Sequence, residues 1–202
     1  MKDFLNKIRS YEKDNFKKIY YLIFLLFGII LGILSKLFDN KSIDFLDLNN
    51  FFSNMSIWLF IALSISIYSK TPKRASINVL LFFLGMTISY HLYSIIFSGF
   101  NPLNYMIGWY ILTIISPLLA YMCWYAKSNS YYSIIINSLI LFVMISSCFS
   151  IGMWYISFKG ILYIITFLAT LIVLYKDIKI ESISLVIGLL LSFIIRLPLI
   201  GG

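Results

Sequence analysis

The fold class is decided by residues 19–38, which read IYYLIFLLFGIILGILSKLF and carry one charge, Lys36, near their end. About 20 apolar residues in a helix are enough to cross the ~30 Å hydrocarbon core of a bilayer. The charged residues 1–18 precede this run, which is too long for the apolar region of a signal peptide and has no small-x-small cleavage site after it. We therefore predict a retained first transmembrane helix.

The same pattern recurs along the rest of the chain, which is 61% hydrophobic and 12% charged with a mean hydropathy of +0.93. Soluble domains are about half apolar and about a quarter charged. Further apolar segments lie at 55–69, 76–99, 103–126, 131–151, 159–175 and 180–199. We expect an all-α polytopic integral membrane helical bundle of about seven transmembrane helices, formed by a single domain, 19–202. The segment 55–69 is the shortest and needs Phe51 and Phe52 to span.

The distribution of basic residues predicts the orientation. With a cytoplasmic N-terminus, 12 of the 16 Lys and Arg residues fall on the inner side: Lys2, Lys7, Arg9, Lys13, Lys17, Lys18, Lys70, Lys73, Arg74, Lys127, Lys176 and Lys179. The other four are Lys36, Lys41, Lys159 and Arg196. This asymmetry is what the positive-inside rule describes. Because the abundance of Ile, Lys, Asn, Tyr and Phe is typical of an AT-rich genome, we expect a multi-pass protein of a bacterial cytoplasmic membrane.

Two segments outside the spans have amphipathic character. Residues 1–18 place Phe4, Ile8 and Tyr11 on one helical stripe among basic residues, which predicts a segment attached to the inner leaflet. The longest outer connection, 39–54, mixes acidic and apolar residues. An interfacial connector and a lid over an outward cavity both fit this composition.

Small residues and a proline suggest how the helices pack. Gly28 and Gly32 form a small-xxx-small pair that allows close approach of two helices, either within one molecule or in a homo-oligomer. Pro117 removes a backbone hydrogen bond to the carbonyl of Thr113 and predicts a helix kink. Thr113 and Ser116 are close enough to satisfy the freed groups.

A candidate ligand site comes from two ionisable residues expected at bilayer depth, His91 and Arg196. Counting 1.5 Å per residue along their helices places both about 22 to 24 Å from the cytoplasmic edge. Other polar and aromatic side chains expected near this level are Tyr90, Thr87, Ser94, Tyr105 and Trp109. Together they predict an outward-facing polar and aromatic cavity. The alternative is an aromatic belt with Arg196 reaching the outer headgroups.

Several functions lack the residues they require. The chain has no HExxH, GxSxG or CxxC motif, a single histidine, and no carboxylate in the middle of a predicted span. We therefore expect no enzyme activity, no metal and no cofactor. The net charge of +8 follows from the inner-side bias and does not indicate nucleic acid binding.

Two function classes remain. The first is a small-molecule carrier or solute-binding membrane subunit that uses the outward cavity. The alternative is a non-catalytic accessory, sensory or immunity-type membrane protein that binds a membrane protein partner. Beyond the lipid bilayer, the expected partner is thus a small-molecule ligand or a second membrane protein.

Overall fold

The computed structural model describes residues 9–10, 19–39, 47–128, 130–152 and 155–195. Its elements, in chain order, are α2 (Ile19–Asp39), α3 (Leu48–Ser53), α4 (Met55–Tyr68), α5 (Pro72–Ser98), α6 (Leu103–Trp124), η1 (Tyr125–Lys127), α7 (Tyr131–Cys148), β1 (Phe149–Ile151), β2 (Ile156–Phe158), α8 (Ile161–Leu174) and α9 (Ile178–Ile194). The predicted interfacial segment 1–18 lies outside the described residues except for Arg9 and Ser10.

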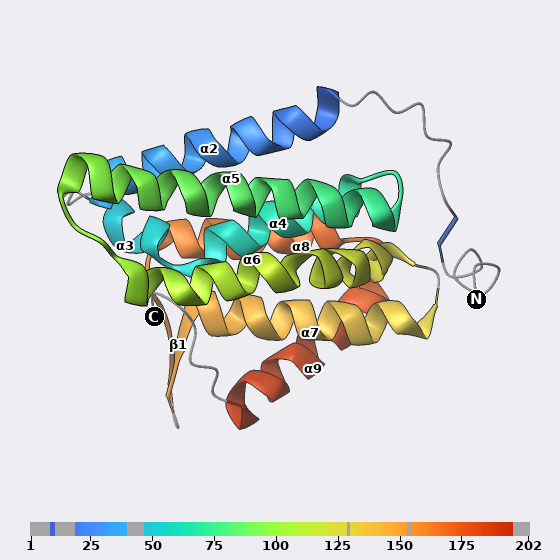
Figure 1. The fold of residues 1–202 in the computed structure, drawn as a ribbon. Coiled ribbons are helices and arrows are strands. Elements are labelled where there is room, and N and C mark those ends of the chain that lie inside the picture. The colour runs from blue at the N-terminus through green and yellow to red at the C-terminus, as the bar shows by residue number, and fades with distance from the viewer. Residues whose placement is uncertain (1–8, 11–18, 40–46, 129, 153–154, 196–202) are drawn as a thin grey trace.

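The long helices lie side by side in one bundle, and successive helices run in opposite directions (Figure 1). We call its two ends the Asp39 end, where α2 and α7 finish, and the Lys127 end, where α4 and α6 finish. Helix α2 packs along α5 and α5 along α6, whereas α7 packs along α9. Helix α4 contacts α5, α6, α7 and α8, so it joins these two groups at the centre of the bundle.

The distribution of side chains is that of a membrane-embedded helical protein. Four helical stretches are long and apolar enough to cross a membrane: Ile19–Asp39, Pro72–Ser98, Leu103–Lys127 and Tyr131–Cys148. Large apolar side chains such as Ile96 and Ile114 cover the outside, while many serines and threonines are buried. Buried hydroxyls such as those of Thr113 and Thr170 donate to carbonyls one turn back in their own helices. Such bonds keep polar groups satisfied where there is no water.

The structure corrects two predicted segment boundaries. Phe51 and Phe52 lie in α3, which is separated from α4 by Asn54, so they do not lengthen the second segment as one helix. The side chain of Asn54 accepts a hydrogen bond from Ser56 N at 2.9 Å and so caps a new helix start. The fifth segment also ends early, because Phe149–Ile151 forms β1, which pairs antiparallel with β2.

Close packing of α2 on α5 depends on glycine. A Cβ atom on Gly28 would overlap the backbone carbonyl of Phe82, and one on Gly32 would overlap the carbonyl of Met86 and the hydroxyl of Ser89. Gly85 on α5 approaches α2 in the same way. The small-xxx-small pair therefore packs against a helix of the same chain.

Candidate functional site

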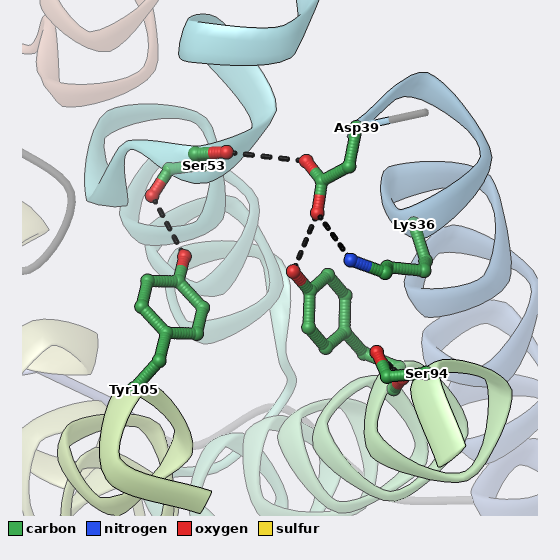
Figure 2. A network of polar contacts seen from close by, with 6 residues as sticks. Lys36, Asp39, Ser53, Ser94 and Tyr105 are labelled. Carbon is green, nitrogen blue, oxygen red and sulfur yellow. Dashed lines mark hydrogen bonds and ion pairs between the residues drawn. The ribbon is translucent and has the colours of Figure 1, made fainter. Parts of the chain in front are cut away.

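At the Asp39 end, a polar cluster forms around the carboxylate of Asp39, the last residue of α2. Its Oδ2 accepts hydrogen bonds from the Tyr90 hydroxyl on α5 at 2.5 Å and from Lys36 Nζ at 3.4 Å. Its Oδ1 accepts one from the Ser53 hydroxyl on α3 at 3.2 Å (Figure 2). A single carboxylate thus connects α2, α3 and α5.

Two aromatic rings extend this cluster towards α6. The Tyr105 hydroxyl donates to the backbone carbonyl of Ser53 at 3.2 Å, and the rings of Tyr90 and Tyr105 lie 6.2 Å apart (Figure 2). Ser94 is also close, but its hydroxyl donates to the carbonyl of Tyr90 in its own helix. The structure therefore brings together three residues of the predicted site.

Little space remains between these side chains. Thr87 and Trp109, two more residues of the predicted site, line a hollow of about 10 Å³ together with Tyr90 and Tyr105. A hollow of that size holds about one water molecule. The cluster therefore links helices, and the hollow beside it is too small for a solute larger than water.

The remaining two residues of the predicted site lie elsewhere. The Nδ1 atom of His91 lies 2.5 Å from the Tyr110 hydroxyl, and its Nε2 lies 2.9 Å from Asn101 Oδ1, so His91 faces α6 and its preceding loop. Successive residues on a helix differ by about 100° in direction, and His91 therefore points away from the cluster that Tyr90 joins. Arg196 lies outside the described residues.

Sequence reasoning missed the residues that organise this cluster, Asp39 and Lys36, because it placed Asp39 in the outer loop. The signal was present in their spacing. An acidic residue three positions after a lysine lies beside it on a helix, and the two side chains form an ion pair here.

A larger site lies on the side of the bundle. It is a cavity of about 200 Å³ between α4, α5, α6 and α7. Its lining is apolar apart from two serines and a cysteine: Leu59, Ala62, Leu63, Ser66, Val79, Phe83, Leu112, Ser116, Leu119, Ala120, Met122, Cys123, Ile136, Leu139, Ile140, Val143 and Met144. The Ser66 and Ser116 hydroxyls donate to the carbonyls of Ala62 and Thr113. The walls therefore suit an apolar molecule.

Local sequence explains why this space exists. Ala62 on α4 and Ser116 and Ala120 on α6 put small side chains around it, and α6 packs more closely on α4 and α5 than on α7. Pro117 lies beside it in α6, and the Ser116 hydroxyl satisfies the Thr113 carbonyl that the proline leaves without its helical donor, as the sequence predicts.

Exposed lining residues indicate that the cavity opens at the side of the bundle. Leu119 and Met122 of α6 and Leu139 of α7 all line it, yet each is between 42% and 46% exposed. In a membrane, these exposed residues would face lipid. The entrance thus lies between α6 and α7.

Within the described ranges, no group of three or more His, Cys, Asp or Glu side chains lies close enough together to hold a metal ion. Comparison with known proteins adds no assignment, since no family model, curated protein or solved structure matches this chain.

Proposed function

We propose that this chain is a multi-pass protein of a bacterial cytoplasmic membrane that binds a lipophilic small molecule, as a carrier or as the binding subunit of one. The observation that supports this proposal is the 200 Å³ apolar cavity with its side entrance between α6 and α7. Dry apolar cavities of about 150 Å³ bind molecules the size of benzene. The space is thus sufficient for a ring or a stretch of alkyl chain.

The chemistry of the lining favours an apolar ligand over the polar solute expected from the sequence. Sites for polar molecules present several convergent polar groups that fix orientation. Here the two serine hydroxyls are already bonded to their own helices. The polar residues at the Asp39 end surround only about 10 Å³.

We further propose that the chain crosses the membrane seven times with its N-terminus in the cytoplasm. The distribution of Lys and Arg supports this orientation, which would place the Lys127 end inside. Reporter fusions after Lys73 and after Lys127 should read cytoplasmic, whereas fusions near Asn49 and at Gly202 should read external. A cytoplasmic C-terminus would contradict a seven-span arrangement.

The alternative function, an accessory, sensory or immunity-type interaction protein, drew its support partly from Gly28 and Gly32. Both glycines pack against α5 of the same chain. Among the described residues we find no other feature that favours this alternative. A protein partner or a homo-oligomer, found without any effect of an apolar ligand, would nevertheless restore it.

Ligand binding is tested by filling the cavity. Ala120 is 3% exposed and lines the cavity, so Ala120→Leu should occupy the space that a ligand needs. We expect an apolar probe such as a medium-chain alkane to stabilise the detergent-purified wild type, by about 2.7 kcal/mol at 100 times its Kd. The Ala120→Leu variant should lose most of this stabilisation. Ala169→Leu makes the same change on α8 away from the cavity and is the matched control.

Two outcomes of this binding experiment would contradict the proposal. Equal stabilisation of wild type and Ala120→Leu would show that the probe binds elsewhere. No stabilisation of the wild type by alkanes or other lipophilic probes would reject the proposed function.

A further inference from the structure

The Lys127 end of the bundle carries an excess of positive charge. Its described basic residues are Arg9, Lys70, Lys73, Arg74, Lys127, Lys176 and Lys179, against the acidic Asp177 and Glu181. Three of the basic residues, Arg9, Lys127 and Lys176, come together from distant parts of the sequence, and we call them the basic cluster.

The protein itself positions the members of the basic cluster. The Arg9 guanidinium donates to the backbone carbonyls of Ile67, at 3.0 Å, and of Trp124, and its Cζ lies 4.1 Å from the centre of the Trp124 ring. Lys176 Nζ donates to the carbonyl of Lys127 at 2.9 Å. Cations from three segments are thereby held next to the end of α6.

The positive charges of the basic cluster act on one another. Burial, and then the positive charges of Arg9 and Lys127, lower the pKa of Lys176 below its usual value. One carboxylate, Glu181, interacts electrostatically with Lys127. Next to Lys127, the Ser128 hydroxyl is buried, at 1% exposure, and has no hydrogen-bond partner among the described residues. An anion with several acceptor oxygens would suit this environment.

The apolar cavity begins directly beside the basic cluster. Met122 and Cys123 line the cavity, and the next residue, Trp124, provides the carbonyl and the ring that hold Arg9. From Cys123 the lining on α6 extends back to Leu112, which corresponds to about 16 Å along the helix axis. A positively charged end thus adjoins an apolar space long enough for much of an acyl chain.

We propose that the basic cluster binds the phosphate of an anionic phospholipid, one of whose acyl chains lies in the apolar cavity. This inference rests on the proposed function, because it names the class of lipophilic ligand. The phosphate accepts hydrogen bonds from Lys127 and Lys176 and is attracted by their positive charges. Arg9, held on Trp124, adds a third positive charge nearby. The acyl chain passes the entrance between α6 and α7 sideways from the bilayer.

The experiment compares phosphatidylglycerol with phosphatidylcholine of the same acyl chains, added to the full chain in detergent. Native mass spectrometry gives the affinity of each lipid. Wild type should bind phosphatidylglycerol preferentially, and Lys127→Gln/Lys176→Gln should weaken that binding about thirtyfold, as expected for two lysines beside an anionic headgroup. Lys70→Gln/Lys73→Gln makes the same charge change at the same end and should weaken it less than threefold.

Two further arms separate the parts of the proposal. Lys127→Arg/Lys176→Arg keeps the charge and should keep the preference even if the glutamine variant folds poorly. Ala120→Leu should weaken the binding of both lipids equally, because it fills the space for the acyl chain and leaves the phosphate site unchanged.

Each contrary result has its own meaning. Equal wild-type affinity for the two lipids would overturn the headgroup site while leaving the apolar ligand site intact. An equal loss in both glutamine variants would show that charge acts nonspecifically, and would also overturn it. Inorganic phosphate that stabilises the protein as strongly as phosphatidylglycerol would replace the lipid by a free anion. Failure of both lipids and of alkanes to bind would reject the proposed function itself.

Discussion

The contact between α2 and α5 allows a quantitative prediction for Gly28→Ala. The new Cβ would overlap the carbonyl oxygen of Phe82 and lie 3.1 Å from the backbone nitrogen of Met86. These are backbone atoms, so no side-chain rotation relieves the overlap, and we take the upper end of the ~1–3 kcal/mol typical of overpacking. Alanine is the better helix former by about 1 kcal/mol. The net loss of stability should be about 2 kcal/mol, which lowers Tm by about 4 to 8 °C for a chain of this size.

Thermal unfolding in detergent can be followed with a thiol-reactive dye, because Cys148 is buried and becomes accessible on unfolding. The control is Gly160→Ala, where the new Cβ would lie 3.5 Å from Cδ2 of Tyr163, an ordinary contact, on an extended backbone. Its Tm should match wild type. If Gly28→Ala melts at or above the wild-type temperature, the close packing of α2 on α5 is wrong.

Three further predictions concern the Asp39 end and the cysteines. Asp39→Asn removes the negative charge that both Lys36 and Tyr90 contact and should lower the free energy of unfolding by about 1 to 3 kcal/mol. A double-mutant cycle with Tyr90→Phe should show a coupling energy of at least ~0.5 kcal/mol, and zero coupling would show that the Tyr90–Asp39 bond does not contribute to stability. Cys123 and Cys148, at opposite ends of the bundle, should never bond to each other, so a crosslink in mass spectra of non-reduced, alkylated protein would contradict the fold. His91→Ala should leave binding of the alkane probe unchanged, and a large loss of affinity would move the ligand site to the Asp39 end.

Helix positions could be predicted from the sequence because an uncharged run of sufficient length has few alternatives in a membrane. Each predicted apolar segment overlaps one of the helices α2 and α4 to α9, although α2, α5 and α9 extend beyond their predicted segments by one to four residues. The boundaries failed where a local polar group decided them. Asn54 starts a new helix with its own side chain, and a short hairpin replaces the predicted end at Ile151.

The direction in which each residue faces could not be predicted in the same way. Counting residues places Tyr90 and His91 at one level, yet Tyr90 bonds to Asp39 and His91 to Tyr110. In a soluble helix the apolar stripe shows which face is inside. Here the outer face is as apolar as the core, so that signal is lost. Such a sequence indicates the depth of a residue in the membrane but not the neighbour that its side chain faces.

The apolar cavity was beyond sequence reasoning for a related reason. Its volume depends on Ala62, Ser116 and Ala120, which come from two helices and face one another only after packing. Small residues in a membrane helix usually mark close helix contact, as Gly28 and Gly32 do here. The same residue types therefore indicate a tight contact or an empty space, and the arrangement of neighbouring helices decides between them.

The short central helix α4 has a consequence for how the protein enters a membrane. Its 14 residues extend only about 21 Å, less than the ~30 Å of a hydrocarbon core. Alone in lipid, α4 would force the bilayer to thin around it. In the finished bundle α5, α6, α7 and α8 contact it and spare it that mismatch. On the proposed seven-span topology, stable insertion of α4 therefore waits for helices that emerge after it, and a nascent chain released just beyond Tyr68 should retain α4 poorly in the bilayer.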